Sequence, residues 1–106
     1  MPLTLDDVAE HVRRANYNIT KHGYEELDKD GITIAMLEVA IGADNPEVIE
    51  DYPNDQRGSS CLIVGWYEAD LPLHMCVAVS GTQPEIITAY KPSSLRFRPP
   101  DFRRRR

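Results

Sequence analysis

The first 42 residues follow a helical pattern of apolar and polar positions. Apolar residues recur at intervals of three and four, and a threonine that can cap a helix precedes each of three such stretches. Asp30-Gly31 and Gly42 mark the ends of the second and third stretches. The pattern predicts three short helices, with residues 16–19 as a connector between the first two, and the caps are Thr4, Thr20 and Thr33.

Beyond Pro46 the pattern changes from helical to alternating, and turn residues recur between the alternating runs. The connections are too short for parallel crossovers. Four strands are predicted, near Glu47 to Tyr52, Ser60 to Tyr67, Leu73 to Ser80 and Glu85 to Lys91. The sequence therefore predicts one α+β domain over residues 1–95, in which two or three amino-terminal helices pack on a four-stranded antiparallel meander sheet.

Composition narrows the class of protein without identifying it. The chain has 106 residues, of which 42% are hydrophobic, so a single domain is expected. Its uncharged apolar stretches are far shorter than the roughly 20 residues of a membrane span, so no membrane association is expected. The first seven residues lack the basic start and apolar run of a secretory signal, so a cytoplasmic location is expected.

Charge is distributed unevenly along the chain. Residues 1–90 carry five basic and sixteen acidic side chains, whereas residues 91–106 carry seven basic and one acidic. Arginine alternates with phenylalanine and proline in the tail, residues 96–106, and such a segment can grip phosphates and stack on RNA bases. The alternative is a solvated, mobile tail, and both interpretations stay open. The candidate nucleic-acid-binding residues are Arg96, Arg98, Arg103 and Arg104.

Alternation along the strands predicts which side chains share a face of the sheet. With turns centred at Ala69-Asp70 and Gly81-Thr82, one face packs against the helices and the other is open to solvent. The predicted helix-facing set is Leu62, Val64, Trp66, Leu73, Met75, Val77, Ile86, Thr88 and Tyr90. The predicted open set includes Cys61, Ile63, His74, Cys76, Ala89 and Lys91.

The two cysteines do not form a disulfide scaffold. In the predicted register Cys61 lies opposite Ala78 and Cys76 lies opposite Ile63, so the cysteine Cα atoms are roughly 7 to 8 Å apart. A disulfide across that span would be strained. We therefore interpret both residues as small buried hydrophobes rather than as a redox pair.

His74 and Lys91 are the first candidates for chemistry. An imidazole and an ammonium on one exposed sheet face can transfer a proton and stabilise a phosphate. The alternative for His74 is a hydrogen-bonded structural role, and for Lys91 a solvated charge at a strand end. His11 and His22 share no metal-ligand spacing with other residues, and no phosphate loop or hydrolase motif is present, so neither a metal nor a cofactor is expected.

Several motifs together resemble a bacterial family called domain of unknown function 4258. They are the stretches 19–23, 30–33, 50–62, 71–74, 87–92 and 101–105, and their order and spacing are more specific than any one of them. Many members carry an arginine and a methionine four and five residues after the histidine that matches His22, where this chain has Glu26 and Leu27. An acidic residue there weakens any phosphate-binding role for this segment.

This family is distantly similar to BrnT and RelE toxins, which are small ribonucleases of toxin–antitoxin pairs. The resemblance implies a metal-independent endoribonuclease with RNA as its substrate and an antitoxin-like, zinc-finger type partner. It implies His74 as acid or base and Arg57 and Lys91 as phosphate-binding cations. Tyr90 is a matched position too, although the predicted alternation directs its ring toward the helices. Arg57 has an alternative role as a turn residue that binds backbone carbonyls.

Two functions therefore remain open. The first is a toxin-like ribonuclease that a partner holds in check. The second is a non-catalytic protein-interaction module that docks a partner through its sheet face or its basic tail.

Overall fold

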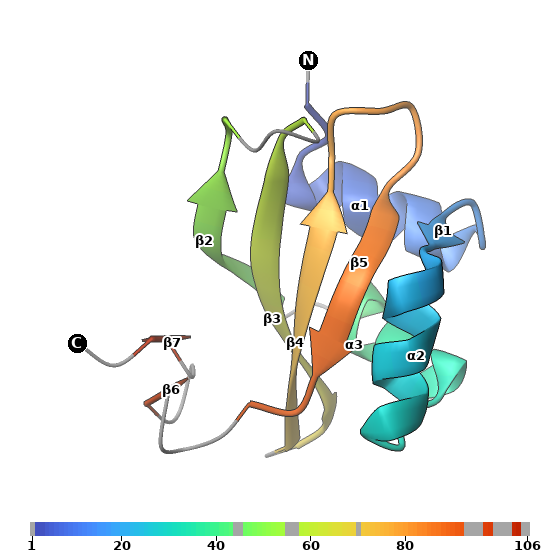
Figure 1. Ribbon diagram of the computed structural model, residues 1–106, viewed down its shortest axis with the longest axis vertical. Coiled ribbons are helices and arrows are strands. Elements are labelled where there is room, and N and C mark those ends of the chain that lie inside the picture. The colour runs from blue at the N-terminus through green and yellow to red at the C-terminus, as the bar shows by residue number, and fades with distance from the viewer. Residues whose placement is uncertain are drawn as a thin grey trace.

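The chain folds as three helices packed on a mixed sheet (Figure 1). The computed structural model describes residues 2–43, 46–54, 58–69 and 71–92, and the backbone alone of residues 97–98 and 103–104. The helices are α1 (Leu5–Arg13), α2 (Lys21–Lys29) and α3 (Ile34–Gly42). The main sheet holds β1 (Asn18–Ile19), β2 (Glu47–Tyr52), β3 (Ser60–Glu68), β4 (Leu71–Ala78) and β5 (Glu85–Tyr90). The α+β class is confirmed, and none of the helices described is long and apolar enough to cross a membrane.

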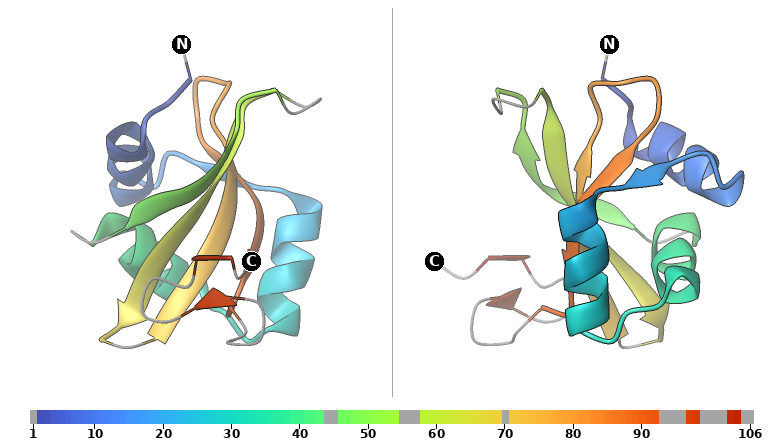
Figure 2. Two further views of the ribbon diagram at one scale, coloured as in Figure 1. Left: turned by 90° about the vertical axis from the view of Figure 1, so that its left-hand side faces the viewer. Right: turned by 45° about the vertical axis from the view of Figure 1, so that its right-hand side comes forward.

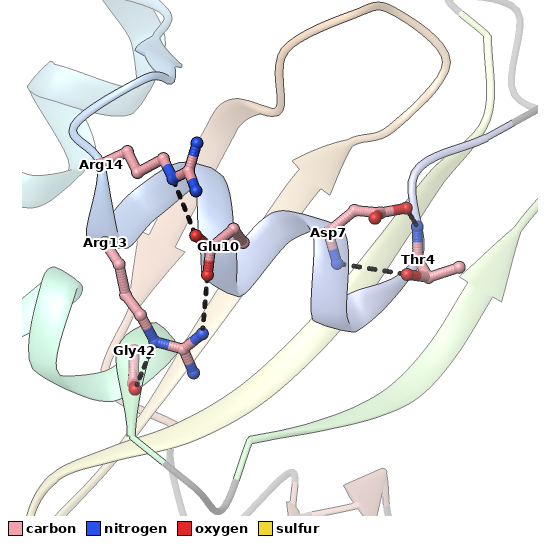
Figure 3. Close-up of polar contacts among 6 residues, drawn as sticks. All are labelled: Thr4, Asp7, Glu10, Arg13, Arg14 and Gly42. Carbon is pink, nitrogen blue, oxygen red and sulfur yellow. Dashed lines mark hydrogen bonds and ion pairs between the residues drawn. The ribbon is translucent and has the colours of Figure 1, made fainter.

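The three predicted helix caps are confirmed. The side-chain oxygens of Thr4, Thr20 and Thr33 each accept a hydrogen bond from a backbone N–H in the first helical turn. At α1 the bond is reciprocal, because the Asp7 carboxylate accepts the Thr4 N–H at 2.9 Å (Figure 3). These bonds from the Thr4 backbone and side chain lower the pKa of Asp7. Local sequence therefore decides where each helix begins.

Arginine side chains form ion pairs within α1 and a hydrogen bond from α1 to α3. Arg14 pairs with Glu10 at 2.7 Å, and Arg13 reaches the same carboxylate at 3.4 Å (Figure 3). The Nε of Arg13 also donates to the Gly42 carbonyl at 3.3 Å, which satisfies an acceptor at the end of α3. Two of the few cations in residues 1–90 are thereby engaged within the helical layer.

The sheet has five strands in the order β1-β5-β4-β3-β2, so the predicted four-stranded antiparallel meander is corrected. Strands β2 to β5 do pair as antiparallel neighbours in chain order. The additional strand β1 pairs in parallel with β5, through bonds from the N–H groups of Asn18 and Thr20 to the carbonyls of Pro84 and Ile86. Sequence alone suggested a connector, because two residues carry no alternation and gain their partner only when β5 is in place.

Each antiparallel pair contains one extra residue, a β-bulge, which changes the predicted faces. The extra residues are Ile49 in β2, Tyr67 in β3 and Ile87 in β5. The predicted turns are right, since Glu68 faces Leu71 and Ala78 faces Glu85. A bulge reverses the alternation beyond it. The predicted helix-facing orientation is therefore wrong for Leu62, Val64, Trp66, Thr88 and Tyr90, and the predicted open orientation is wrong for Cys61, Ile63 and Ala89.

The helices cover one face of the sheet, which we call the helix-side face. Its buried strand residues are Cys61, Ile63, Leu73, Met75, Val77, Ile86 and Ala89, packed against Val8, Val12, Leu27, Leu37 and Ile41. Gly65 faces α3 so closely that a Cβ on it would clash with the backbone of Ala40. This contact sets the spacing of the two layers.

The opposite face, which we call the outer face, carries no helix. Two further strands, β6 (Phe97–Arg98) and β7 (Arg103–Arg104), pair with each other as a separate antiparallel ribbon, which we call the β6–β7 hairpin. The hairpin lies on the side of the sheet away from the helices and in front of its outer face (Figures 1 and 2). The arginines of β6 and β7 therefore lie on the side of the sheet that is opposite α1 and α3.

Candidate functional site

Residues of four strands form two rows across the outer face. In the first row Glu47 faces Val64, Val64 faces His74 and His74 faces Tyr90. The second row is Glu50, Leu62, Cys76 and Thr88. Directly opposed residues share a face and lie about 5 Å apart at Cβ. Each row thus runs from a carboxylate on β2, through an apolar residue, to a hydroxyl on β5.

His74 and Tyr90 form a hydrogen-bonded pair at the end of the first row. Nδ1 of His74 lies 3.2 Å from the Tyr90 hydroxyl, and the ring centroids are 5.3 Å apart with the planes at 66°. His74 is 0% exposed. The prediction that it points away from the helices is right, but the prediction that it faces solvent is wrong. Burial and a hydrogen-bonding partner are the features that the structural alternative for His74 requires, and its role as an acid or base stays a prediction.

The bulge at Ile87 explains why Tyr90 reaches His74. Without it, alternation from Ile86 would send Tyr90 toward the helices, as predicted. With Ile87 as the extra residue, Ala89 faces the helices and Tyr90 faces outward. The Ile87 carbonyl accepts the Thr20 hydroxyl at 3.2 Å, so the cap of α2 also holds the bulge. The predicted inward orientation of Tyr90 is therefore wrong.

Lys91, a further predicted catalytic residue, does not join this pair. Lys91 is exposed, and its backbone N–H donates to Asp30 at the end of α2 at 3.0 Å. The same bulge moves Ala89 to the helix side, so the predicted sharing of a face by His74, Ala89 and Lys91 no longer holds. Arg57 lies outside the described residues. Of the four predicted catalytic residues, only His74 and Tyr90 are in contact in the part of the chain that is described.

The four predicted nucleic-acid-binding arginines fall in or beside the β6–β7 hairpin. Arg96 lies outside the described residues, whereas Arg98, Arg103 and Arg104 occupy the two strands. In the ladder Arg98 is opposite Arg103, and Phe97 is opposite Arg104. Cationic residues at opposed positions concentrate positive charge, which favours an anion nearby.

Sequence reasoning missed the carboxylates that border the outer face. Glu47 is exposed, and Glu50 is half-buried and accepts a hydrogen bond from the Tyr52 hydroxyl. The prediction that Glu50 and Asp51 point to opposite faces is confirmed, since Glu50 faces Leu62 and Asp51 faces Cys61. Glu47 and Glu50 belong to the two rows only through the pairings of β2 with β3, β3 with β4 and β4 with β5. The sequence of β2 alone therefore could not reveal these positions.

The two cysteines lie on opposite faces of the sheet and are not joined in a disulfide. Cys61 faces Val77 on the helix side and Cys76 faces Leu62 on the outer face, so the predicted register is wrong. Cys61 is 7% exposed, and burial raises the pKa of its thiol to about 11, with Asp51 and Cys76 adding to the shift. Cys76 is half-buried. The pair cannot form a disulfide across the sheet.

The remaining histidines have local partners. His11 Nδ1 lies 3.0 Å from the Asn16 carbonyl oxygen, and His22 lies 3.7 Å from Glu26 one helical turn on. Glu26, which departs from the family pattern, thus occupies the position that can pair with protonated His22. Within the described residues, no group of three histidine, cysteine or acidic side chains could hold a metal ion.

The geometry limits what the His74–Tyr90 pair can do. A general acid or base must lie within hydrogen-bond reach of the atom whose proton it transfers. His74 has no exposed surface, so in this conformation a dissolved substrate does not reach its ring. The pair can orient side chains within the outer face, whereas the charged groups that reach solvent lie at its border.

Comparison with known proteins gives one finding about this fold. The model of a family described as "Domain of unknown function (DUF4258)" matches residues 19–91. The matched range includes α2, α3 and strands β2 to β5, and excludes α1 and the β6–β7 hairpin. No curated protein and no solved structure matches the chain.

Proposed function

Given that this chain belongs to the DUF4258 family, whose description assigns no activity, we propose that it is a non-catalytic protein-interaction module that docks an acidic partner protein through the β6–β7 hairpin. The burial of His74 carries this proposal. The histidine best placed for catalysis is enclosed, and Lys91, the predicted catalytic cation that the structure describes, is exposed. The proposal therefore places function at the basic β6–β7 hairpin rather than at His74.

The distribution of charge supports an acidic partner. The first 90 residues are strongly acidic and the last 16 are strongly basic. Of the five basic residues in the first 90, Arg13 and Arg14 pair with Glu10. A polyanion is therefore repelled by most of the surface and attracted to one end, which orients its approach. The antitoxin-like, zinc-finger type partner is retained as one form that such a protein can take.

A second candidate function is the metal-independent ribonuclease of the BrnT and RelE type. One observation favours it: the Ile87 bulge brings the Tyr90 hydroxyl within 3.2 Å of the His74 imidazole. Such a pair can relay a proton once RNA reaches it. This candidate requires a conformation in which the outer face is open.

Binding to a polyglutamate peptide tests the docking proposal, with the peptide standing in for an acidic partner. We expect the double variant R103Q/R104Q of the full chain to bind at least about fivefold more weakly, since each exposed charge pair contributes up to about 1 kcal/mol. The matched control K21Q/K29Q removes the same charge from α2, where both lysines are exposed. Fluorescence anisotropy of the labelled peptide gives the dissociation constants. Equal weakening in the two variants would contradict the proposal.

An RNA assay with the same proteins separates the two functions. We expect RNA to remain intact with the wild-type chain. Fragmentation that Y90F reduces would instead favour the ribonuclease, because that change removes only the hydroxyl beside His74. If the chain binds an RNA oligonucleotide much more tightly than a peptide of equal charge, the ligand of the hairpin is a nucleic acid rather than an acidic protein.

A further inference from the structure

The outer face is more deeply buried than its place in the fold explains. Val64 and His74 are 0% exposed and Leu62 is 4% exposed, although α1 and α3 lie on the other face and α2 lies beside the edge of the sheet at β5 (Figure 2). The helix-side core cluster contains none of these three residues. In a sheet with helices on one face only, the central residues of the other face ordinarily meet water. The Tyr90 ring contributes to the burial of His74, and a second layer over this face would complete the exclusion of water from the first row.

The β6–β7 hairpin is the described element on that side of the sheet. Two views at right angles place it in front of the outer face, at the end where β5 finishes (Figures 1 and 2). The first row lies at this same end, because Tyr90 is the last residue of β5 and faces His74. The deepest burial on the outer face and the position of the hairpin thus coincide.

Charge also matches the hairpin to this face. Each row begins with a carboxylate on β2, Glu47 in the first and Glu50 in the second. The hairpin contributes Arg98, Arg103 and Arg104 by sequence, two of them at opposed positions. Anionic residues beside an apolar centre complement a ribbon that joins arginine to phenylalanine.

We infer that the outer face is a docking surface for the chain's own β6–β7 hairpin, held there by charge, and that an acidic ligand which binds the hairpin lifts it and uncovers the His74–Tyr90 row. The inference rests on the proposed function for the ligand that displaces the hairpin. The intramolecular docking itself rests on burial, position and charge alone. The outer face and the acidic partner then compete for the hairpin. Binding of the partner therefore increases the exposure of the His74–Tyr90 row.

The face carries two natural probes of its covering. Trp66, the single tryptophan, faces Pro72 on the outer face, and Cys76 lies in the second row. Cys61 serves as an internal control, since it lies on the helix side and is buried. Alkylation of Cys76 relative to Cys61, together with acrylamide quenching of Trp66, reports exposure of the outer face without an activity assay.

The experiment compares the full-length wild type with R103Q/R104Q and with the control K21Q/K29Q. We expect R103Q/R104Q to raise the Cys76 alkylation rate about threefold or more and to increase Trp66 quenching, with Cys61 unchanged. K21Q/K29Q should behave as wild type. E47Q/E50Q, which neutralises the facing carboxylates, should reproduce the effect from the other side. Unchanged Cys76 and Trp66 in both R103Q/R104Q and E47Q/E50Q would overturn the inference.

Adding the polyglutamate peptide to wild type then tests displacement. We expect Cys76 alkylation to rise with the same midpoint as peptide binding. Peptide binding without any change at Cys76 or Trp66 would overturn the displacement while leaving the proposed function intact. An open face in R103Q/R104Q together with no peptide binding to wild type would support the intramolecular docking and contradict the proposed function. A rise in Cys61 alkylation in step with Cys76 would indicate general unfolding and would also count against the inference.

Discussion

At Gly65 the backbone of α3 approaches the sheet so closely that no side chain fits between them. A Cβ at this position would lie 2.8 Å from the carbonyl carbon of Ala40, and closer still to its oxygen. Both obstructing atoms belong to the backbone, so a rotamer change cannot relieve the contact. The helix would have to move away from β3, which would loosen the packing of its neighbours Leu37 and Ile41.

The substitution Gly65→Ala should therefore lower the free energy of unfolding by about 3 kcal/mol, at the upper end of the usual cost of overpacking. Urea denaturation followed by circular dichroism measures this difference. Gly81→Ala is the matched control, because a Cβ at that position would lie 3.7 Å from its nearest neighbour, in ordinary contact. A loss at Gly65 no larger than that at Gly81 would show that the layers can separate at little cost.

At the scale of elements, Thr20 connects the start of α2 to the bulge in β5. Its side-chain oxygen accepts the Gly23 N–H at 2.9 Å and its hydroxyl donates to the Ile87 carbonyl at 3.2 Å. Its backbone N–H also bonds to Ile86 and extends the β1 pairing. One residue thus caps a helix, continues a strand and holds the extra residue that turns Tyr90 outward.

Thr20→Val removes the hydroxyl while keeping the shape of the side chain. We expect it to cost about 2 kcal/mol, of which about 1 is the lost cap and the rest the unsatisfied carbonyl of Ile87. Thr33→Val provides the comparison, because Thr33 caps α3 through Met36 at 3.1 Å and is exposed. The difference between the two variants in thermal or urea unfolding isolates the bond to the bulge. Equal losses would mean that this bond contributes nothing measurable.

The elements also show what the sequence could and could not predict. Caps, turns and element types depend on neighbouring residues, so Thr4, Thr20 and Thr33 and the strand positions were predictable. The face of the sheet to which each strand residue points was not predictable. The position of a bulge depends on the pairing of two strands, and the sequence around Ile87 carries no local signal for it. The burial of His74 was harder still to predict, because it depends on the groups that lie over the outer face.

At the scale of the whole molecule, two weak acids with raised pKa values, buried Cys61 and partly buried Tyr17, make stability depend on pH in the alkaline range. Burial raises the pKa of Cys61 from 9.0 to about 11, with smaller contributions from Asp51 and Cys76. Burial is also the largest cause of the raised pKa of Tyr17, and the 2.7 Å hydrogen bond from its hydroxyl to Glu38 is the second. In both cases the folded protein keeps a proton that the unfolded chain releases, so folding is favoured less as pH increases.

We therefore expect the free energy of unfolding to fall as pH rises from 9 to about 11, the interval between the unfolded and folded pKa values of Cys61. Cys61→Ala should reduce this slope and leave the neutral-pH slope unchanged, and Tyr17→Phe should reduce the slope above pH 10. Urea denaturation at a series of pH values provides the curve. An alkaline slope that is the same in Cys61→Ala as in wild type would contradict the assignment.

The bulge at Ile87 has a consequence for how this fold tolerates changes in length. Val77 and Cys76 are consecutive, yet they pair with Ile86 and Thr88, so Ile87 is surplus to the ladder. Deleting it would cost the bond from Thr20 but would leave His74 opposite Tyr90. Inserting a residue on either side of Thr88 would instead exchange Ala89 and Tyr90 between the two layers. In an alignment of relatives, a single-residue gap at Ile87 is thus compatible with the same outer face. A single-residue gap at Ala89 is not.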